Sequence, residues 1–224
     1  MNPYALSITV LSLALGTTAT LTSHHWVLAW VGLEINTLAI IPLMTKNPHP
    51  RAIEAATKYF LTQAAASALI LFASTMNAWL TGEWAINTHM DATPTILISI
   101  ALAMKLGIAP FHFWLPDVLQ GLTLQTGLIL STWQKLAPMV LLIQVAPYTN
   151  LSLLLALGLL STLIGGWGGI NQTQIRKILA FSSIAHLGWM LAILKISPQL
   201  TMLNFALYIL MTFTPFLTFI FINT

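Results

Sequence analysis

Apolar segments about 20 residues long recur along the whole chain, separated by short polar stretches. A helix needs about 20 predominantly apolar residues to cross the hydrocarbon core of a bilayer. Hydrophobic residues make up 57% of the 224 residues, and only 6% are charged. Soluble domains carry about a quarter charged residues, so this chain cannot cover a water-facing surface. Transmembrane β-strands would be about ten residues long with alternating polarity, which does not occur here. The sequence therefore predicts an all-α, polytopic transmembrane bundle.

Turn-forming residues between the apolar segments divide the chain into about eight predicted spans. The predicted spans are 4–21, 26–45, 59–80, 94–112, 123–146, 150–169, 178–195 and 201–222. No soluble domain is predicted beside them, so residues 1–224 form one transmembrane domain. No cleavable signal or targeting peptide is visible, and the first span is expected to be retained.

The basic residues outside the spans are distributed asymmetrically, which predicts an orientation in the membrane. Five of them fall in loops that lie on one side if the spans alternate: Lys46, Arg51, Lys58, Arg176 and Lys177. Loops rich in lysine and arginine stay on the cytoplasmic side, or on the matrix side in mitochondria. The net charge of +3 is explained by this bias, and nucleic-acid binding is not expected.

The chain contains no cysteine. Disulfides, thiolate zinc sites and iron–sulfur ligation are therefore excluded for this chain. Any electron-transfer cofactor must be held by other residues or by another chain.

Three charged side chains lie inside predicted spans, namely Glu34, Lys105 and Lys135. At about 1.5 Å of rise per residue, they lie roughly 12, 16 and 18 Å into their spans, near the midplane. A charge at this depth costs at least about 2.5 kcal/mol, so each should have a partner or face a hydrated cavity. One buried Glu–Lys pair that only locks helices together is the structural alternative, and it leaves the second lysine unexplained.

A proline follows each lysine at a short distance and interrupts the helical hydrogen bonding beside it. Pro110 cannot donate to the carbonyl of Leu106, and Pro138 cannot donate to the carbonyl of Gln134. Freed carbonyls at membrane depth are tolerated where they line a cavity, and broken helices often mark ion sites in transporters. An ordinary proline kink is the alternative at each position.

Buried lysines and histidines together are typical of a proton relay. Burial disfavours a charged lysine and a nearby carboxylate favours it, so such a lysine can change its charge as the partner moves. His112 lies seven residues after Lys105, which predicts the same helix face two turns away. His186 lies mid-span, with Ser182 and Ser183 one turn before it. Imidazole exchanges protons near neutral pH, although a lone histidine can also be structural. Haem ligation by these histidines is not expected, because their depths differ and no CxxCH motif exists.

The stretches KLGIAPFHFWLPDV and GGWGGINQTQIRKILAFSSIAHLGWM, with a second lysine between them, resemble the antiporter-like subunits of respiratory complex I, the NADH–ubiquinone oxidoreductase. The segments MNPYALSITVLSLALGTT and HHWVLAWVGLEINTLAIIPLM narrow the resemblance to a mitochondrial subunit of the vertebrate type. The resemblance covers the whole chain. It implies an inverted-repeat fold with a broken helix around Lys105–Pro110. Residues 1–146 would form the first five-helix repeat, and 150–224 part of the second.

The resemblance also implies roles for individual residues. Glu34 would interact with Lys105 on the broken helix, and Lys135 would be the next lysine on a central polar axis. His112 and His186 match polar positions near that axis. Together these residues would translocate protons across the mitochondrial inner membrane.

The partners implied are the other membrane-arm subunits and the phospholipid membrane. NADH, flavin (FMN), iron–sulfur clusters and ubiquinone would be used by other subunits, with no cofactor or metal in this chain. Family members are longer and have a further lysine in a second broken helix, so we expect the sequence to be incomplete at its C-terminus. Two alternatives stay open: an independent cation/proton antiporter that shares the glutamate–lysine arrangement, and a purely structural anchor in a respiratory assembly.

Overall fold

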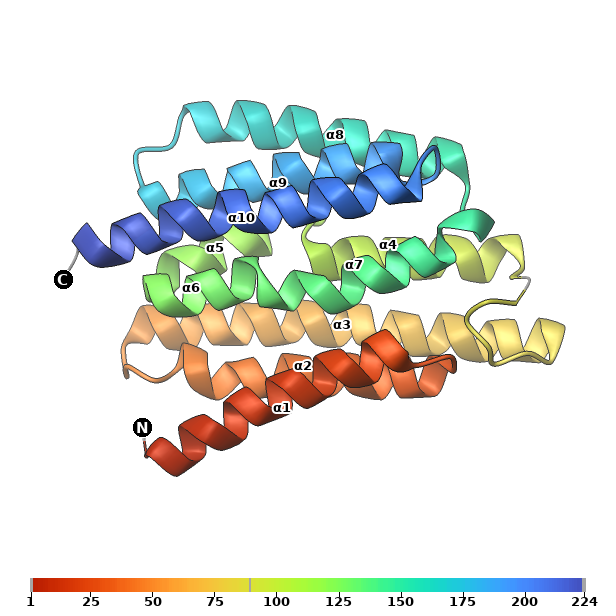
Figure 1. Ribbon diagram of the computed structural model, residues 1–224, viewed down its shortest axis with the longest axis horizontal. Coiled ribbons are helices and arrows are strands. Elements are labelled where there is room, and N and C mark those ends of the chain that lie inside the picture. The colour runs from red at the N-terminus through yellow and green to blue at the C-terminus, as the bar shows by residue number, and fades with distance from the viewer. Residues whose placement is uncertain (1, 89, 223–224) are drawn as a thin grey trace.

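The computed structural model describes residues 2–88 and 90–222, which form a bundle of α-helices (Figure 1). Within these residues the only β-type pairing is an isolated antiparallel bridge between His25 and Ala85. The helices are Pro3–Thr22 (α1), Trp26–Met44 (α2), Pro50–Thr81 (α3), Ala92–Leu106 (α4), Trp114–Gly121 (α5), Leu124–Ser131 (α6), Trp133–Val145 (α7), Leu151–Ile170 (α8), Ile175–Leu194 (α9) and Pro198–Ile222 (α10), with a short 3-10 helix, Ala146–Tyr148, after α7.

In the described part of the chain, seven helical segments are long and apolar enough to cross a membrane, with α6 to Tyr148 taken as one segment. The helix α4 is apolar but shorter. The outer helices α1, α8 and α10 expose many apolar side chains, including Leu11, Leu163 and Met211. The predicted fold class, an all-α polytopic bundle of about eight spans, is confirmed. Both chain ends lie at the left-hand end of the bundle in Figure 1, as alternating spans require.

The third predicted span began too late. The helix α3 starts at Pro50 instead of residue 59, because proline suits the first helical position and the ring of His49 accepts the N–H of Arg51 at 3.1 Å. Arg51 and Lys58 therefore lie on the helix and not in a loop. Arg176 likewise belongs to the first turn of α9.

The fourth predicted span, 94–112, extended too far. The helix α4 ends at Leu106, where Gly107 adopts the left-handed conformation (φ 75°, ψ 39°). The N–H groups of Gly107 and Ile108 turn back to carbonyls of the last turn, an arrangement typical of a helix that ends at glycine. The chain becomes helical again only at Trp114, so α5 occupies a stretch that we expected to be a loop. The predicted break around Lys105–Pro110 is confirmed.

The fifth predicted span contains a second break, which lies before Lys135 and not at Pro138. The N–H of Lys135 bonds to Thr132 at 3.2 Å, three residues back, and so skips the carbonyl of Ser131. The hydroxyl of Thr132 bonds to the carbonyl of Leu128 at 2.7 Å, a local contact of the kind that bends helices. Pro138 lies within α7 and does not end it.

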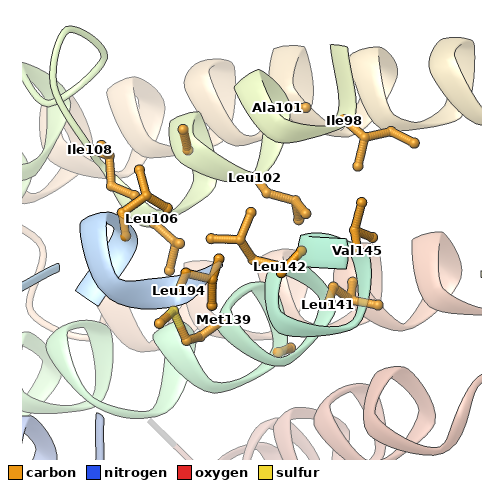
Figure 2. Packing of buried hydrophobic residues seen from close by; sticks show 14 of the residues in the cluster. Ile98, Ala101, Leu102, Leu106, Ile108, Met139, Leu141, Leu142, Val145 and Leu194 are labelled. Carbon is orange, nitrogen blue, oxygen red and sulfur yellow. The ribbon is translucent and has the colours of Figure 1, made fainter. Parts of the chain in front are cut away.

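An apolar layer between α4 and α7 fixes how the two breaks face each other. The helices are antiparallel, with Ile98 near Val145 at one end and Leu106 near Met139 at the other (Figure 2). The C-terminal end of α4 therefore meets the beginning of α7, so Lys105 and Lys135 come from adjoining helix ends.

The helices α8 and α9 pack closely through glycines. A Cβ on Gly165 would lie 2.6 Å from the backbone nitrogen of Ala185, and one on Gly188 would lie 2.5 Å from the Cβ of Ser161. Small residues at such positions let membrane helices approach closely. Because the hydroxyl of Ser161 also accepts the N–H of Ala109 at 2.9 Å, this helix pair supports the broken segment after α4.

Candidate functional site

The C-terminal end of α4 lies inside the protein, where the carbonyl of Met104 accepts the N–H of Gly107 and those of Lys105 and Leu106 have no backbone donor among the described residues. Carbonyls at a helix end need other partners when they are buried. Three side chains from other elements supply them: Trp114 Nε1 donates to Met104 at 3.1 Å, Gln63 Nε2 to Lys105 at 3.5 Å, and Lys135 Nζ to Leu106.

Lys135 is 1% exposed and has no carboxylate partner among the described residues. Its ammonium group donates to the carbonyl of Leu106 and lies 5.4 Å from the ring centroid of Trp114. The negative end of the α4 dipole and the aromatic face both favour a cation there. The carbonyl of Leu106, which we expected to be free beside Lys105, is thus used by the other lysine.

Lys105 is 4% exposed, and its ammonium donates to the hydroxyl of Ser67 at 2.7 Å. Glu34 is half-buried on α2 and accepts the hydroxyl of Thr37 at 3.2 Å. No ion pair of 4 Å or less joins Glu34 to Lys105, because both ion pairs found in the described residues involve Lys58. In this conformation Lys105 is therefore held by a neutral group.

A small cavity of about 10 Å³ lies between the two lysines. Besides Lys105 and Lys135, its lining includes Asn36, Tyr59 and Gln134. This volume is about that needed for one water molecule in a polar site. The Oδ1 atom of Asn36 is buried without a hydrogen-bond partner among the described residues, so the cavity contains an acceptor available to a proton-carrying molecule.

His112 lies in the non-helical segment between α4 and α5, outside the lining of this cavity. The expectation that it shares a helix face with Lys105 is wrong, because the helix ends between them. His112 is 5% exposed, its ring centroid lies 4.2 Å from that of Phe113, and its Nδ1 atom has no hydrogen-bond partner among the described residues.

His186 lies on α9, outside the lining of the cavity beside the two lysines, and is exposed. Its Nδ1 atom is 2.7 Å from the carbonyl of Ser182, and its ring centroid is 6.0 Å from that of Tyr208. Ser183 is fully buried and donates to the carbonyl of Ala180 at 2.7 Å.

Several residues of the site were not identified from the sequence. Gln63 and Ser67 are buried four residues apart on α3, so polar side chains at helical spacing in an apolar span were the available signal. Trp114 is 7% exposed and lies against Lys135, a contact that no local sequence pattern indicates.

Two buried lysines at broken helices, inside an all-helical membrane bundle, define an antiporter-like membrane protein. A family model described as NADH:quinone oxidoreductase/Mrp antiporter, TM, matches residues 23–224. The chain belongs to this family.

The chain is similar to NADH-ubiquinone oxidoreductase chain 2 from several vertebrates. It is 69% identical to that of Aquarana catesbeiana over 218 residues, which cover 97% of this chain and 63% of the relative. It is 64% identical to that of Squalus acanthias over 224 residues, or 64% of the relative. The chain thus spans slightly less than two thirds of these relatives.

Two solved structures have the same fold. A chain of respiratory complex I from Thermus thermophilus with bound aureothin matches with a TM-score of 0.90 and 31% identity, over 96% of this chain and 51% of that one. A chain of the Mrp complex from Dietzia sp. matches with a TM-score of 0.78 over 91% of this chain and 44% of that one. At 19% identity the second match shows the fold alone.

Proposed function

We propose that this chain is a core membrane subunit of NADH:ubiquinone oxidoreductase that contributes to proton translocation across the mitochondrial inner membrane. The observation that carries this proposal is the pair Lys105 and Lys135, both buried, which line one small cavity where two helices are broken. Buried ammonium groups are costly in a membrane and are typical of ion and proton pathways.

The two lysines can exchange a proton without a metal or redox centre. Because like charges repel in a low-dielectric site, a charge on one lysine disfavours a charge on the other. Movement of Glu34 toward Lys105 favours the charge there. When Glu34 moves away, the charge shifts to Lys135, where the carbonyl of Leu106 and the ring of Trp114 stabilise it. A water molecule in the cavity would carry the proton between them.

His112 and His186 would serve as proton-carrying groups on either side of the lysine pair. Neither lines the cavity, so each requires water or a hydroxyl between itself and the lysines. Residues 1–146 would form the first repeat of the inverted-repeat fold, and 150–224 part of the second.

The similarity to NADH-ubiquinone oxidoreductase chain 2 supports the assignment to this enzyme. As a subunit, the chain would act with the other membrane-arm subunits and the surrounding phospholipid. Electron transfer from NADH through FMN and iron–sulfur clusters to ubiquinone would occur in other subunits and drive the proton movement.

The experiment that tests this proposal measures proton pumping and NADH oxidation in inner-membrane vesicles that contain the assembled complex. Lys105→Met should abolish most pumping, because it removes one of the two buried charges, and Glu34→Gln should slow it, because it removes the carboxylate whose approach favours the charge on Lys105. If Lys105→Met pumped at the parent rate in a fully assembled complex, the chain would be a structural anchor instead. Cation/proton exchange without NADH, insensitive to inhibitors of the complex, would support an independent antiporter.

A further inference from the structure

Tyr208 on α10 donates its hydroxyl to a carbonyl that the break between α6 and α7 leaves without its helical donor. In a continuous helix the N–H of Lys135 would donate to the carbonyl of Ser131. Here it donates to the carbonyl of Thr132 at 3.2 Å. The hydroxyl of Tyr208 takes its place and donates to the carbonyl of Ser131 at 2.8 Å. Tyr208 is 1% exposed, so no bulk water can replace this contact.

We propose that Tyr208 is a positioning residue for Lys135, which holds the helix break that presents the lysine to the carbonyl of Leu106. The functional consequence rests on the proposed role of Lys135 in proton transfer. Lys135 is the third residue of α7, so the geometry of the break determines where its side chain begins.

The broken segment has a second arrangement available to it. Without the hydroxyl of Tyr208, the carbonyl of Ser131 is left unsatisfied in an apolar site, a state that buried backbone groups avoid. The N–H of Lys135 could satisfy this carbonyl by moving to it from the carbonyl of Thr132. That rearrangement would join α6 and α7 into one helix. That change would turn Lys135 relative to the end of α4 and weaken its bond to Leu106.

Contacts on α9 and α10 fix the ring of Tyr208 in place. Its ring centroid lies 6.2 Å from that of Phe205 on α10 and 6.0 Å from that of His186 on α9. Tyr208 therefore connects the break beside Lys135 to the part of α9 that contains His186.

Hydrogen–deuterium exchange in the assembled complex tests this role, with proton pumping measured in parallel. Tyr208→Phe removes one oxygen and keeps the ring contacts. We expect changed exchange at the amides of residues 132–136 and a loss of pumping of about tenfold or more, because small misplacements of reacting groups are costly. Tyr148→Phe is the matched control, because its hydroxyl also donates to a backbone carbonyl, that of Asn87, at 2.6 Å. The control should match the parent in both measurements.

The proposal is overturned if Tyr208→Phe leaves exchange at 132–136 unchanged, or if exchange changes while pumping stays at the parent rate. These outcomes differ from failure of the proposed function, which would appear as normal pumping in Lys105→Met. Should Tyr208→Phe assemble poorly, Tyr208→Gln and Tyr208→Leu form a second pair. Better assembly and parent-like exchange in the Gln variant, which keeps a donor, supports the proposal, and equal behaviour of the pair overturns it.

Discussion

Lys135 is stabilised as a cation by a carbonyl and an aromatic face instead of a carboxylate. Its Nζ donates to the carbonyl of Leu106, which precedes the break after α4. The same atom lies 5.4 Å from the ring centroid of Trp114, which follows that break. Such a site can hold a positive charge without committing it to an ion pair. Release of the proton then requires no separation of a buried salt bridge, which would be costly.

Replacement of Lys135 by a residue of similar length tests whether its charge, and not its packing, is needed for proton pumping. Lys135→Met keeps the length and apolar stem but removes the charge, so we expect at least a tenfold loss of proton pumping in an assembled complex. Lys58→Met is the control: that lysine pairs with Glu54 and Asp117 at 2.9 Å but is exposed. Exposed pairs contribute about 0–1 kcal/mol, so the control should pump normally. Equal pumping in the two variants would contradict a role for Lys135.

The ring and the N–H of Trp114 contribute separately to the stability of the complex. Trp114→Phe keeps an aromatic face for Lys135 but loses the bond to the carbonyl of Met104, 3.1 Å long. Trp114→Leu loses both. We expect Leu to destabilise the complex by about 0.5–2 kcal/mol more than Phe, the range of cation–π contributions. Thermal inactivation of the purified complex would measure the difference, and identical midpoints would show that the ring contributes nothing.

The charged residues of the site could be predicted from the sequence because each is expensive in a membrane. Glu34, Lys105 and Lys135 are exceptional in apolar spans, whatever the fold. The side chains that contact these charged residues are uncharged, so a cost of burial in the membrane does not single them out. Ser67 and Trp114 are ordinary residues of membrane helices, and only tertiary packing brings Ser67 to within 2.7 Å of the ammonium of Lys105.

The break after α4 depends on a glycine that no other residue replaces without strain. Gly107 has φ 75°, and a Cβ there would lie 3.3 Å from the ring of Trp114. Gly107→Ala should cost about 1–2 kcal/mol for the left-handed backbone, plus displacement of Trp114 and reduced pumping. Gly82→Ala is the control, because Gly82 has φ 76° with nothing within 4 Å of the added Cβ. Both variants should lose stability, but a pumping defect in Gly82→Ala as large as in Gly107→Ala would contradict the role of Trp114.

The close packing of α8 on α9 also supports the broken segment after α4. Gly188→Ala places a Cβ 2.5 Å from that of Ser161, whose hydroxyl holds the N–H of Ala109. We expect a loss of about 1–3 kcal/mol, as for other overpacked sites, measured by thermal inactivation. Gly166→Ala is the control on α8, since nothing lies within 4 Å of its added Cβ. Equal stability of the two variants would show that α8 and α9 can separate at little cost.

The two breaks illustrate what an element-level pattern can and cannot predict. Gly107 and Pro110 together predict the first break, because glycine is the residue that most often ends a helix in the left-handed conformation and proline removes a helical hydrogen bond shortly after it. At the second, Pro138 was misleading: a helix can accommodate a proline, and α7 contains it. The actual break depends on Tyr208, 77 residues from Ser131 in sequence. No local pattern contains that contact.

At the scale of the whole molecule, the alternation of spans places charge at the two ends of the bundle. The connection between α2 and α3 and that between α8 and α9 lie at the left-hand end in Figure 1, together with both chain ends. Four basic residues lie in or next to these connections: Lys46, Arg51, Arg176 and Lys177. Lysine and arginine resist translocation across the membrane, so this end should face the matrix.

Single cysteines test this orientation cleanly, because the chain has no cysteine of its own. Asn47 and Glu83 are exposed in the connections on either side of α3. A membrane-impermeant thiol reagent added to mitoplasts should label Glu83→Cys and spare Asn47→Cys, and inverted inner-membrane vesicles should give the reverse pattern. Labelling of both variants in detergent is the control for access. Labelling from the same side would contradict the alternation of spans, whereas a reversed pattern would keep the alternation and invert the orientation. The direction of the proposed proton transfer between Lys105 and Lys135 would then be opposite relative to the matrix, although the local geometry of the two lysines would be unchanged.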